Sequence, residues 1–249
     1  MTGPGERSTS ISALLSELAE APDRAPEELL PELRPGDVVA GRFELARELG
    51  RGGFGLVFEA RDLELGRAVA FKAIRPIRTR ALERLAKPLK EEAEAAARLN
   101  HPNVVTLHDS GVHDGTPYLI MELLRGETLA VRLRRGPLAP AEALRVALEV
   151  AHGLVAAHAA GVLHRDLKPG NVFLTERGAV KLVDFGLASI MGRASLAAGT
   201  PAYMAPEQLR GQAEDPRTDV FSAAVVLFEA LTGALPYPVS GGRSAVLDA

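Results

Sequence analysis

The chain of 249 residues contains no cysteine, which excludes disulfide bonds, thiolate metal sites and a cysteine nucleophile. Its 29 basic and 32 acidic residues leave a formal net charge of -3, so no basic field points to a nucleic-acid partner. No run of about 18 uncharged apolar residues occurs, and the N-terminus lacks a basic segment followed by an apolar one. The default expectation is a cytoplasmic protein with no membrane segment in this chain.

Hydrophobic residues make up 47% of the chain, which suffices for one large domain or two lobes with their own cores. Residues 1–37 differ from the rest, because prolines interrupt them repeatedly. We expect this segment to be a flexible leader, with a docking segment for a partner as the alternative.

Two short apolar runs, 172–174 and 180–183, flank a polar turn and predict a β-hairpin. Such a hairpin would hold Asp166 and Asn171 on one side and Asp184 on the other, all facing one cleft. Carboxylate and carboxamide oxygens are hard ligands, so this set suits magnesium rather than zinc.

A lysine, Lys168, lies two residues after Asp166 and adds a mobile positive charge. Oxygen ligands for a divalent cation, a carboxylate base and a lysine together are suited to moving a phosphoryl group. These residues therefore predict phosphoryl transfer.

Glycines are concentrated at 50–55, between two predicted strands. Because glycine has no Cβ, the backbone N–H groups of this stretch can approach phosphate oxygens closely. The G-x-G-x-x-G spacing alone also fits dinucleotide-binding folds. Here, however, the glycines are followed by a strand at 68–74 that carries Lys72, not by a helix. This order favours a glycine-rich lid with a phosphate-binding lysine.

The remaining pattern is read as further strands and helices. The expected strands are 104–107 and 118–123, and the expected helices are 81–100, 128–134, 139–160 and 219–231. The helix at 139–160 is long, apolar and alanine-rich, which predicts a buried core helix. The histidines that it carries, His152 and His158, are interpreted as structural.

Six motifs follow one another in a fixed order. They are the glycine lid at 50–55, Val69-Ala70-Phe71-Lys72, His164-Arg165-Asp166-Leu167-Lys168-Pro169-Gly170-Asn171, Asp184-Phe185-Gly186, Ala205-Pro206-Glu207 and the helix opening at Asp219. This set resembles the eukaryotic-type protein kinases and, within them, the bacterial serine/threonine kinases. The resemblance runs from about Gly41 to Tyr237.

The resemblance implies an α+β, bilobal protein-kinase-like fold. Its N-lobe, at 38–122, would be an antiparallel β-sheet with one main helix. Its C-lobe, at 123–249, would be mostly helical and incomplete at the C-terminus.

The resemblance also implies a role for each matching side chain. Lys72 would hold the α- and β-phosphates of ATP and be fixed by Glu92. Asn171 and Asp184 would hold Mg²⁺, with Mn²⁺ as an alternative. The substrate would be a protein carrying a serine or threonine.

Asp166 would accept or orient the substrate hydroxyl, and Lys168 would neutralise the transferring γ-phosphoryl group. Adenine would lie between the lobes. The implied nucleotide-binding positions are Gly50, Arg51, Gly52, Gly53, Phe54, Gly55, Val57, Ala70, Lys72, Met121, Glu122, Leu124 and Phe173.

Arg165, beside Asp166, implies a switch, because an arginine there can pair with a phosphate on the following loop and order it. Specificity for serine and threonine is suggested by Lys168 and by the segment 199–203. The candidate phosphorylation sites are Ser189, Ser195 and Thr200, of which Ser195 is nearest the usual position.

The chain departs from the family pattern near its end at Ala249. Kinase C-lobes continue through more helices, one of which supplies an arginine for the glutamate of Ala-Pro-Glu, here Glu207. No such arginine is placed in this sequence, so Glu207 is expected to be exposed or otherwise paired. The helix at 220–231 would expose an apolar patch. A fragment of a longer chain is favoured over a product with an incomplete lobe, because every catalytic position is present.

Two alternatives to a protein kinase follow. The first is a kinase-like scaffold that holds nucleotide with little or no turnover because its C-lobe is incomplete. The second is a phosphotransferase acting on small molecules, which is disfavoured by the complete Ala-Pro-Glu segment at 205–207, since this segment serves peptide docking in protein kinases.

Overall fold

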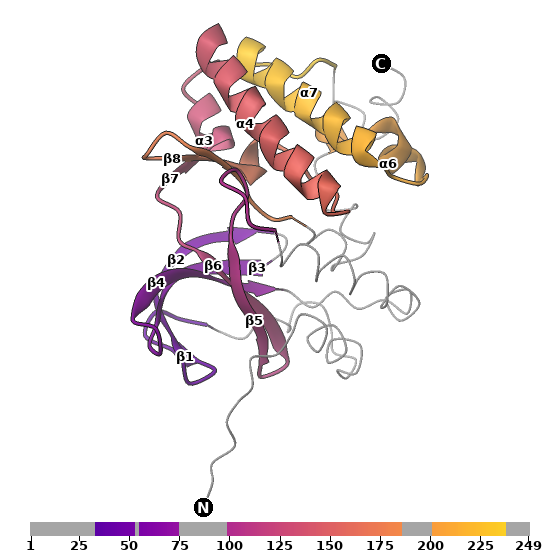
Figure 1. Ribbon diagram of the computed structural model, residues 1–249. Coiled ribbons are helices and arrows are strands. Elements are labelled where there is room, and N and C mark those ends of the chain that lie inside the picture. Colours follow the sequence, from indigo (N-terminus) through magenta and orange to yellow (C-terminus); the bar gives the residue numbers. More distant parts are fainter. Residues whose placement is uncertain (1–32, 53–54, 75–98, 186–200, 238–249) are drawn as a thin grey trace, which may run out of the picture. The chain divides into compact units, whose positions relative to one another are not determined.

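The computed structural model describes residues 33–52, 55–74, 99–185 and 201–237 (Figure 1). These residues form two compact units. The first contains 33–52, 55–74 and 106–124, and the second contains 99–105, 125–185 and 201–237. The sequence placed the division after residue 122, whereas the segment 99–105 groups with the second unit.

The first unit is a six-stranded antiparallel sheet with the strand order β1-β2-β3-β4-β6-β5 (Figure 1). Its strands are β1 (Val38–Val39), β2 (Phe43–Gly52), β3 (Gly55–Asp62), β4 (Arg67–Ile74), β5 (Leu107–His113) and β6 (Thr116–Glu122). Each strand pairs with its neighbours through backbone hydrogen bonds, which fix the register that the site depends on.

Two of the expected strands, at 68–74 and 118–123, are confirmed as β4 and β6, but the one at 104–107 is wrong. Val104 makes only an isolated parallel bridge to Leu182 of the second unit, and β5 begins at Leu107. The β-branched pair at 104–105 looks like a strand in sequence, yet its backbone bonds His101, Lys181 and Leu182 instead of pairing along a strand.

Aromatic side chains form the centre of the first unit's core. Phe43, Phe71 and Tyr118 are buried, and the rings of Phe71 and Tyr118 stack with their centroids 5.0 Å apart. The Phe43 ring meets Tyr118 edge-on at 5.8 Å. Such pairs stabilise a core beyond the area that they bury. Gly111 is required beside them, because a Cβ there would lie 2.4 Å from the Tyr118 hydroxyl oxygen.

A buried ion pair fixes the turn between β3 and β4. Asp62 has no exposed surface, and its carboxylate accepts hydrogen bonds from Arg42 Nε and Nη2 at 2.9 and 2.8 Å. It also accepts from the backbone N–H groups of Glu64 and Leu65. The hydrogen bond from Arg42 is the largest of several effects, and the pKa of Asp62 is held below its ordinary value.

The second unit combines a small sheet with helices. The sheet has the order β7-β8-β9, formed by β7 (Gly126–Thr128), β8 (Val172–Thr175) and β9 (Val180–Leu182). The α-helices are α3 (Leu129–Leu133), α4 (Pro140–Ala159), α6 (Pro206–Arg210) and α7 (Pro216–Thr232), and η1 (Pro169–Asn171) and η3 (Pro201–Tyr203) are short 3-10 helices. The hairpin expected at 172–183 is confirmed by the pairing of β8 with β9.

Local signals explain where the two long helices start and stop. Proline occupies the first turn of both α4 and α7, where its missing N–H costs no hydrogen bond. Asp215 caps α7 by accepting from Arg217 N, and Gly233 ends it in the left-handed conformation. The helix starts before the expected Asp219, because its first turn is polar and lies outside the apolar pattern.

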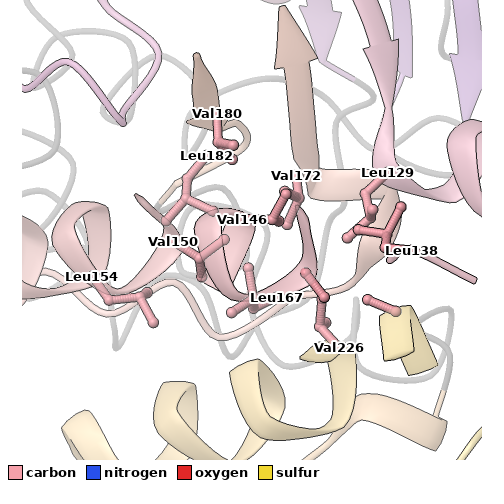
Figure 2. Close-up of a cluster of buried hydrophobic side chains, with 12 residues drawn as sticks. Leu129, Leu138, Val146, Val150, Leu154, Leu167, Val172, Val180, Leu182 and Val226 are labelled. Atoms are coloured by element: carbon pink, nitrogen blue, oxygen red, sulfur yellow. The ribbon is translucent and has the colours of Figure 1, made fainter. Parts of the chain in front are cut away.

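Helices α4 and α7 pack against each other, and α4 also packs against β9 of the small sheet (Figure 1). Figure 2 shows the buried cluster, in which side chains of α4 and α7 meet those of the loop and hairpin between them. The labelled members are Leu129, Leu138, Val146, Val150, Leu154, Leu167, Val172, Val180, Leu182 and Val226. The segment that carries the candidate site is therefore anchored in the second unit's core.

The antiparallel first unit and the mostly helical second unit confirm the expected α+β class. On α7, the side chains of Val220, Phe228 and Leu231 are exposed, in line with the expected apolar patch. None of the helices among the described residues has the length and apolar character needed to cross a membrane. Of the expected leader at 1–37, residues 1–32 lie outside the described residues, whereas Gly36 and Asp37 are held by backbone hydrogen bonds with Leu45. Of the expected helix at 81–100, residues 81–98 lie outside the described residues, and 99–100 are not helical.

Candidate active site

Three of the predicted site residues meet in the loop between α4 and β8. The Nζ atom of Lys168 lies 2.7 Å from Asp166 Oδ2, as a salt bridge. The Nδ2 atom of Asn171 donates to the backbone oxygen of Asp166 at 2.7 Å and to Asp166 Oδ2 at 3.1 Å. The carboxylate is thus held by one positive charge and one amide donor, and both come from residues within five positions of Asp166.

The residues before Asp166 are fixed by burial. His164 is fully buried, its Nε2 lies 3.1 Å from the backbone oxygen of Val183, and its ring packs against Phe185 at 4.6 Å. Pro169 opens the short η1 helix, whose turn closes with the hydrogen bond from Asn171 N to Lys168 O. This turn brings Asn171 back toward Asp166.

A buried carboxylate on α7 anchors the same loop. Asp219 Oδ2 accepts from the backbone N–H of His164, and Oδ1 accepts from that of Arg165, both at 2.8 Å. Oδ2 also lies 2.7 Å from Nε2 of His158 on α4. Burial acts to raise the pKa of Asp219, but the hydrogen bond from His158 and the two N–H groups outweigh it and hold the pKa below its ordinary value.

The residue next to Asp166 adopts an unusual backbone conformation. Arg165 has φ 65, in the left-handed region that non-glycine residues rarely enter. Its backbone oxygen accepts from Gln208 Nε2 at 2.8 Å, and its Nε donates to Glu214 Oε2 at 2.8 Å. Contacts from α6 and from the loop before α7 therefore hold this residue.

The hairpin places Asp184 at the same end as Asn171. Val172 pairs with Leu182, and the backbone N–H of Val183 donates to the backbone oxygen of Asn171 at 3.0 Å. Asp184 follows directly and has φ 66. The backbone pairing therefore places Asn171 and Asp184 at one end of the hairpin.

The predicted phosphate-binding lysine belongs to the first unit. Lys72 lies on β4 opposite Val57 of β3 and Leu119 of β6, and only 4% of its surface is exposed. Ala70 lies two residues earlier, opposite Met121 of β6. Of the expected adenine contacts, Val57 thus lies opposite Lys72 on β3, whereas Ala70 is on β4 itself and Met121 lies opposite Ala70 on β6.

The glycine stretch closes the hairpin of β2 and β3, where Gly50 pairs with Val57 and Gly52 with Gly55. Gly55 has φ 140, and a Cβ there would lie 1.9 Å from the backbone oxygen of Ala73. Only glycine fits this position, because both the conformation and the space exclude a side chain.

The other predicted positions are dispersed or outside the described residues. Arg51 is exposed on β2, Glu122 and Leu124 are half-buried at the end of the first unit, and Phe173 is half-buried on β8 of the second unit. The predicted residues outside the described part are Gly53, Phe54, Glu92, Ser189, Ser195 and Thr200.

Sequence reasoning missed several groups that hold the site. It gave no partner for Glu207, whereas Thr218 Oγ1 donates to Glu207 Oε1 at 2.7 Å. It did not identify Gln208 or Glu214 as partners of Arg165. These contacts join residues more than ten positions apart, and no periodic pattern marks such pairs.

Comparison with known proteins identifies the family of this chain. The family model described as "Protein kinase domain" matches residues 43–248. A probable serine/threonine-protein kinase of Corynebacterium efficiens is 38% identical over 212 residues, which cover 80% of this chain and 32% of that protein. Serine/threonine-protein kinase PknA of Mycobacterium tuberculosis is 38% identical over 225 residues, covering 86% of this chain and 52% of PknA.

Among solved structures, the PknI kinase domain of Mycobacterium tuberculosis matches with a TM-score of 0.69 and 30% identity, covering 85% of this chain and 82% of that domain. The chain belongs to the protein kinase domain family. Its resemblance to bacterial serine/threonine kinases, inferred from the motifs, is confirmed. The chain spans between about a third and a half of the length of these two curated relatives.

Proposed function

We propose that the protein transfers the γ-phosphoryl group of ATP to serine and threonine hydroxyls of protein substrates. The observation that carries this proposal is the set of contacts that joins Asp166 to Lys168 and Asn171. Phosphoryl transfer needs positioning and charge stabilisation more than a covalent enzyme intermediate. Relatives named as serine/threonine-protein kinases support the same conclusion.

We assign to Asp166 the role of contacting the substrate hydroxyl. A carboxylate here accepts the hydroxyl proton or orients the oxygen for attack on phosphorus. Lys168, 2.7 Å from the same carboxylate, donates to the γ-phosphoryl oxygens as charge develops on them. Because Lys168 also neutralises Asp166, it limits repulsion between the base and the phosphate.

The donors at the end of the hairpin fit a hard divalent cation. Asn171 uses its amide nitrogen on Asp166, so its amide oxygen takes no part in these two hydrogen bonds. Asp184 supplies a carboxylate at the same end of the hairpin. We assign Mg²⁺ to these two oxygen ligands, with Mn²⁺ as an alternative, and the cation would bridge and neutralise phosphate oxygens.

We assign nucleotide binding mainly to residues of the first unit. Lys72 would pair with the α- and β-phosphates, with Glu92 as its proposed partner. The glycine hairpin at 50–55 would cover the phosphates, since Gly55 leaves the backbone open. Val57, Ala70, Met121, Glu122, Leu124 and Phe173 are the proposed adenine contacts.

Regulation and location complete the proposal. We expect autophosphorylation in the loop between Phe185 and Pro201, with Ser195 as the first candidate, and a cytoplasmic location for this chain. A phosphopeptide map with no phosphate at 187–200 would contradict the regulatory part alone.

The experiment compares transfer from ATP with Mg²⁺ to a generic basic protein by the wild type and by Asp166→Asn. Asn keeps the size of the side chain but removes the base, so we expect transfer to fall at least about a hundredfold. Glu142→Gln, which alters an ion pair with Arg132 elsewhere in the second unit, is the matched control. Equal transfer by wild type and Asp166→Asn would favour the alternative of a nucleotide-binding scaffold. Phosphoamino-acid analysis of the product tests the expected serine and threonine specificity.

A further inference from the structure

Arg165 is held at three points by the segment that runs from α6 into α7. Asp219 accepts its backbone N–H, Gln208 donates to its backbone oxygen, and Glu214 accepts from its side chain, each at 2.8 Å. A left-handed arginine is costly and persists only where its surroundings fix it. The three contacts supply that fixation immediately before Asp166.

Of these three partners, Glu214 is the one that forms an ion pair with the Arg165 side chain. In this pair the side chains of Arg165 and Glu214 are 24% and 12% exposed. The neighbouring pair of Arg217 with Asp215 is 89% and 44% exposed. Salt and water screen a shielded ion pair much less than an exposed one. The pair with Glu214 therefore constrains Arg165 more strongly than the pair with Asp215 constrains Arg217.

The position of Glu214 is set by the elements on either side. α6 ends at Gly211 in the left-handed conformation, and Gln212 N donates back to Glu207 O at 2.8 Å. Asp215 already caps α7. The short connection between two fixed helix ends thus presents Glu214 to Arg165.

A carboxylate at this point has a chemical consequence. The arginine beside Asp166 was expected to bind a phosphate on the following loop, which would order the site. Glu214 supplies a negative charge to the same guanidinium from within the described chain. Such an anion is present whether or not the chain is phosphorylated.

We propose that Glu214 is a positioning residue for phosphoryl transfer. Its carboxylate holds Arg165, and through the shared peptide bond Asp166, in the productive conformation when the protein carries no phosphate. This inference rests on the proposed kinase function. It predicts that the dephosphorylated protein keeps activity and that this activity depends on the charge of Glu214.

The test uses the full chain after phosphatase treatment, with the absence of phosphate verified by intact mass. Transfer to the basic protein is measured for wild type, Glu214→Gln, Glu214→Asp and the control Glu142→Gln. We expect Glu214→Gln to lower kcat roughly tenfold to a hundredfold, because small displacements of a catalytic group have effects of this size. KM for ATP should stay within about twofold, since nucleotide binding is not the step affected. Glu214→Asp, which keeps the charge, should have a higher kcat than Glu214→Gln. If Glu214 acted through packing alone, kcat would not depend on whether the charge is kept.

Hydrogen exchange gives a second readout that does not require turnover. Glu214→Gln should speed amide exchange at 164–166 at least about tenfold relative to wild type, while the amides of α4 at 146–157 keep their protection. Unchanged exchange and unchanged kcat would overturn the proposal. An increase of kcat in Glu214→Gln would also overturn it, because Glu214 would then restrain the site. If wild type transfers no more phosphate than Asp166→Asn, the kinase function fails, and the exchange comparison still decides whether Glu214 holds Arg165.

Discussion

The Nε2 atom of His158 on α4 lies 2.7 Å from Oδ2 of Asp219 on α7, and the carboxylate is fully buried. An ionised carboxylate can only accept hydrogen bonds, so His158 carries the proton on this nitrogen. The same carboxylate accepts the backbone N–H groups of His164 and Arg165. One buried charge therefore joins two helices to the loop that carries Asp166.

Replacing this charge should destabilise the second unit. Asp219→Asn leaves one carbonyl oxygen for three donors and turns an amide N–H₂ group toward at least one of them. We expect the free energy of unfolding to fall by about 1.5–3 kcal/mol, the range for hydrogen bonds to a charged group. Urea titration at pH 7 measures it. Asp215→Asn on the same helix is the control, because asparagine caps a helix as well as aspartate does. An equal loss in both variants would contradict the account.

Acid should weaken the first unit through Asp62. Its pKa in the folded protein lies below the ordinary value of 3.8, chiefly because of the hydrogen bond from Arg42. The ionised carboxylate therefore stabilises the fold fully above the unfolded pKa of about 4, and this contribution is lost as pH falls through the lower folded pKa.

The variant Asp62→Asn separates this contribution from other effects of acid. At pH 7 it should lower the free energy of unfolding by about 2 kcal/mol or more, since it removes one partner of a buried pair. The difference from wild type should shrink as the pH is lowered below about 4. Glu64→Gln, which removes the 69% exposed partner of the same arginine, should cost less than about 1 kcal/mol. A difference for Asp62→Asn that does not change with pH would refute the assignment.

The close approach of α4 to the segment before β5 depends on Gly153. A Cβ there would lie 2.9 Å from the backbone oxygen of Asn103 and 2.9 Å from Leu182 Cδ1. Asn103 cannot easily move away, because its side chain bonds Glu149 and the backbone oxygen of Val180.

Gly153→Ala should therefore destabilise the protein by about 1–3 kcal/mol, although alanine is the better helix former. Thermal unfolding measures the change. His152→Ala, which truncates the exposed neighbour on the same helix, should stay within about 0.5 kcal/mol. A stabilised Gly153→Ala would mean that helix propensity outweighs the steric contact.

The sequence predicted the parts of the fold that follow local rules. The hairpin at 172–183 was predicted because two apolar runs and the polar turn between them lie within a few positions of one another. The motif around Asp166 was recognisable as a unit, and the contacts of Lys168 and Asn171 with it span at most five positions.

Contacts between distant segments were not predictable in the same way. The pair Arg165–Glu214 joins positions 49 apart, and neither side chain belongs to a periodic pattern. The error at 104–107 has a related cause, because Val104 takes its single bridge from Leu182, a distant strand of another sheet. Such partners are decided by tertiary packing, which overrides local β-propensity.

The central claim is that Lys72 of the first unit and Asp184 of the second are each required for binding of a nucleotide with its metal ion. Calorimetric titration with a non-hydrolysable ATP analogue and Mg²⁺ tests it most directly, using wild type, Lys72→Ala from the first unit, Asp184→Asn from the second and Glu142→Gln as the control. We predict one bound nucleotide per chain, with affinity reduced at least about tenfold by each of the first two substitutions, because each removes a charge-assisted contact. The control should bind as wild type does. Magnesium-dependent binding that neither Lys72→Ala nor Asp184→Asn weakens would contradict the account.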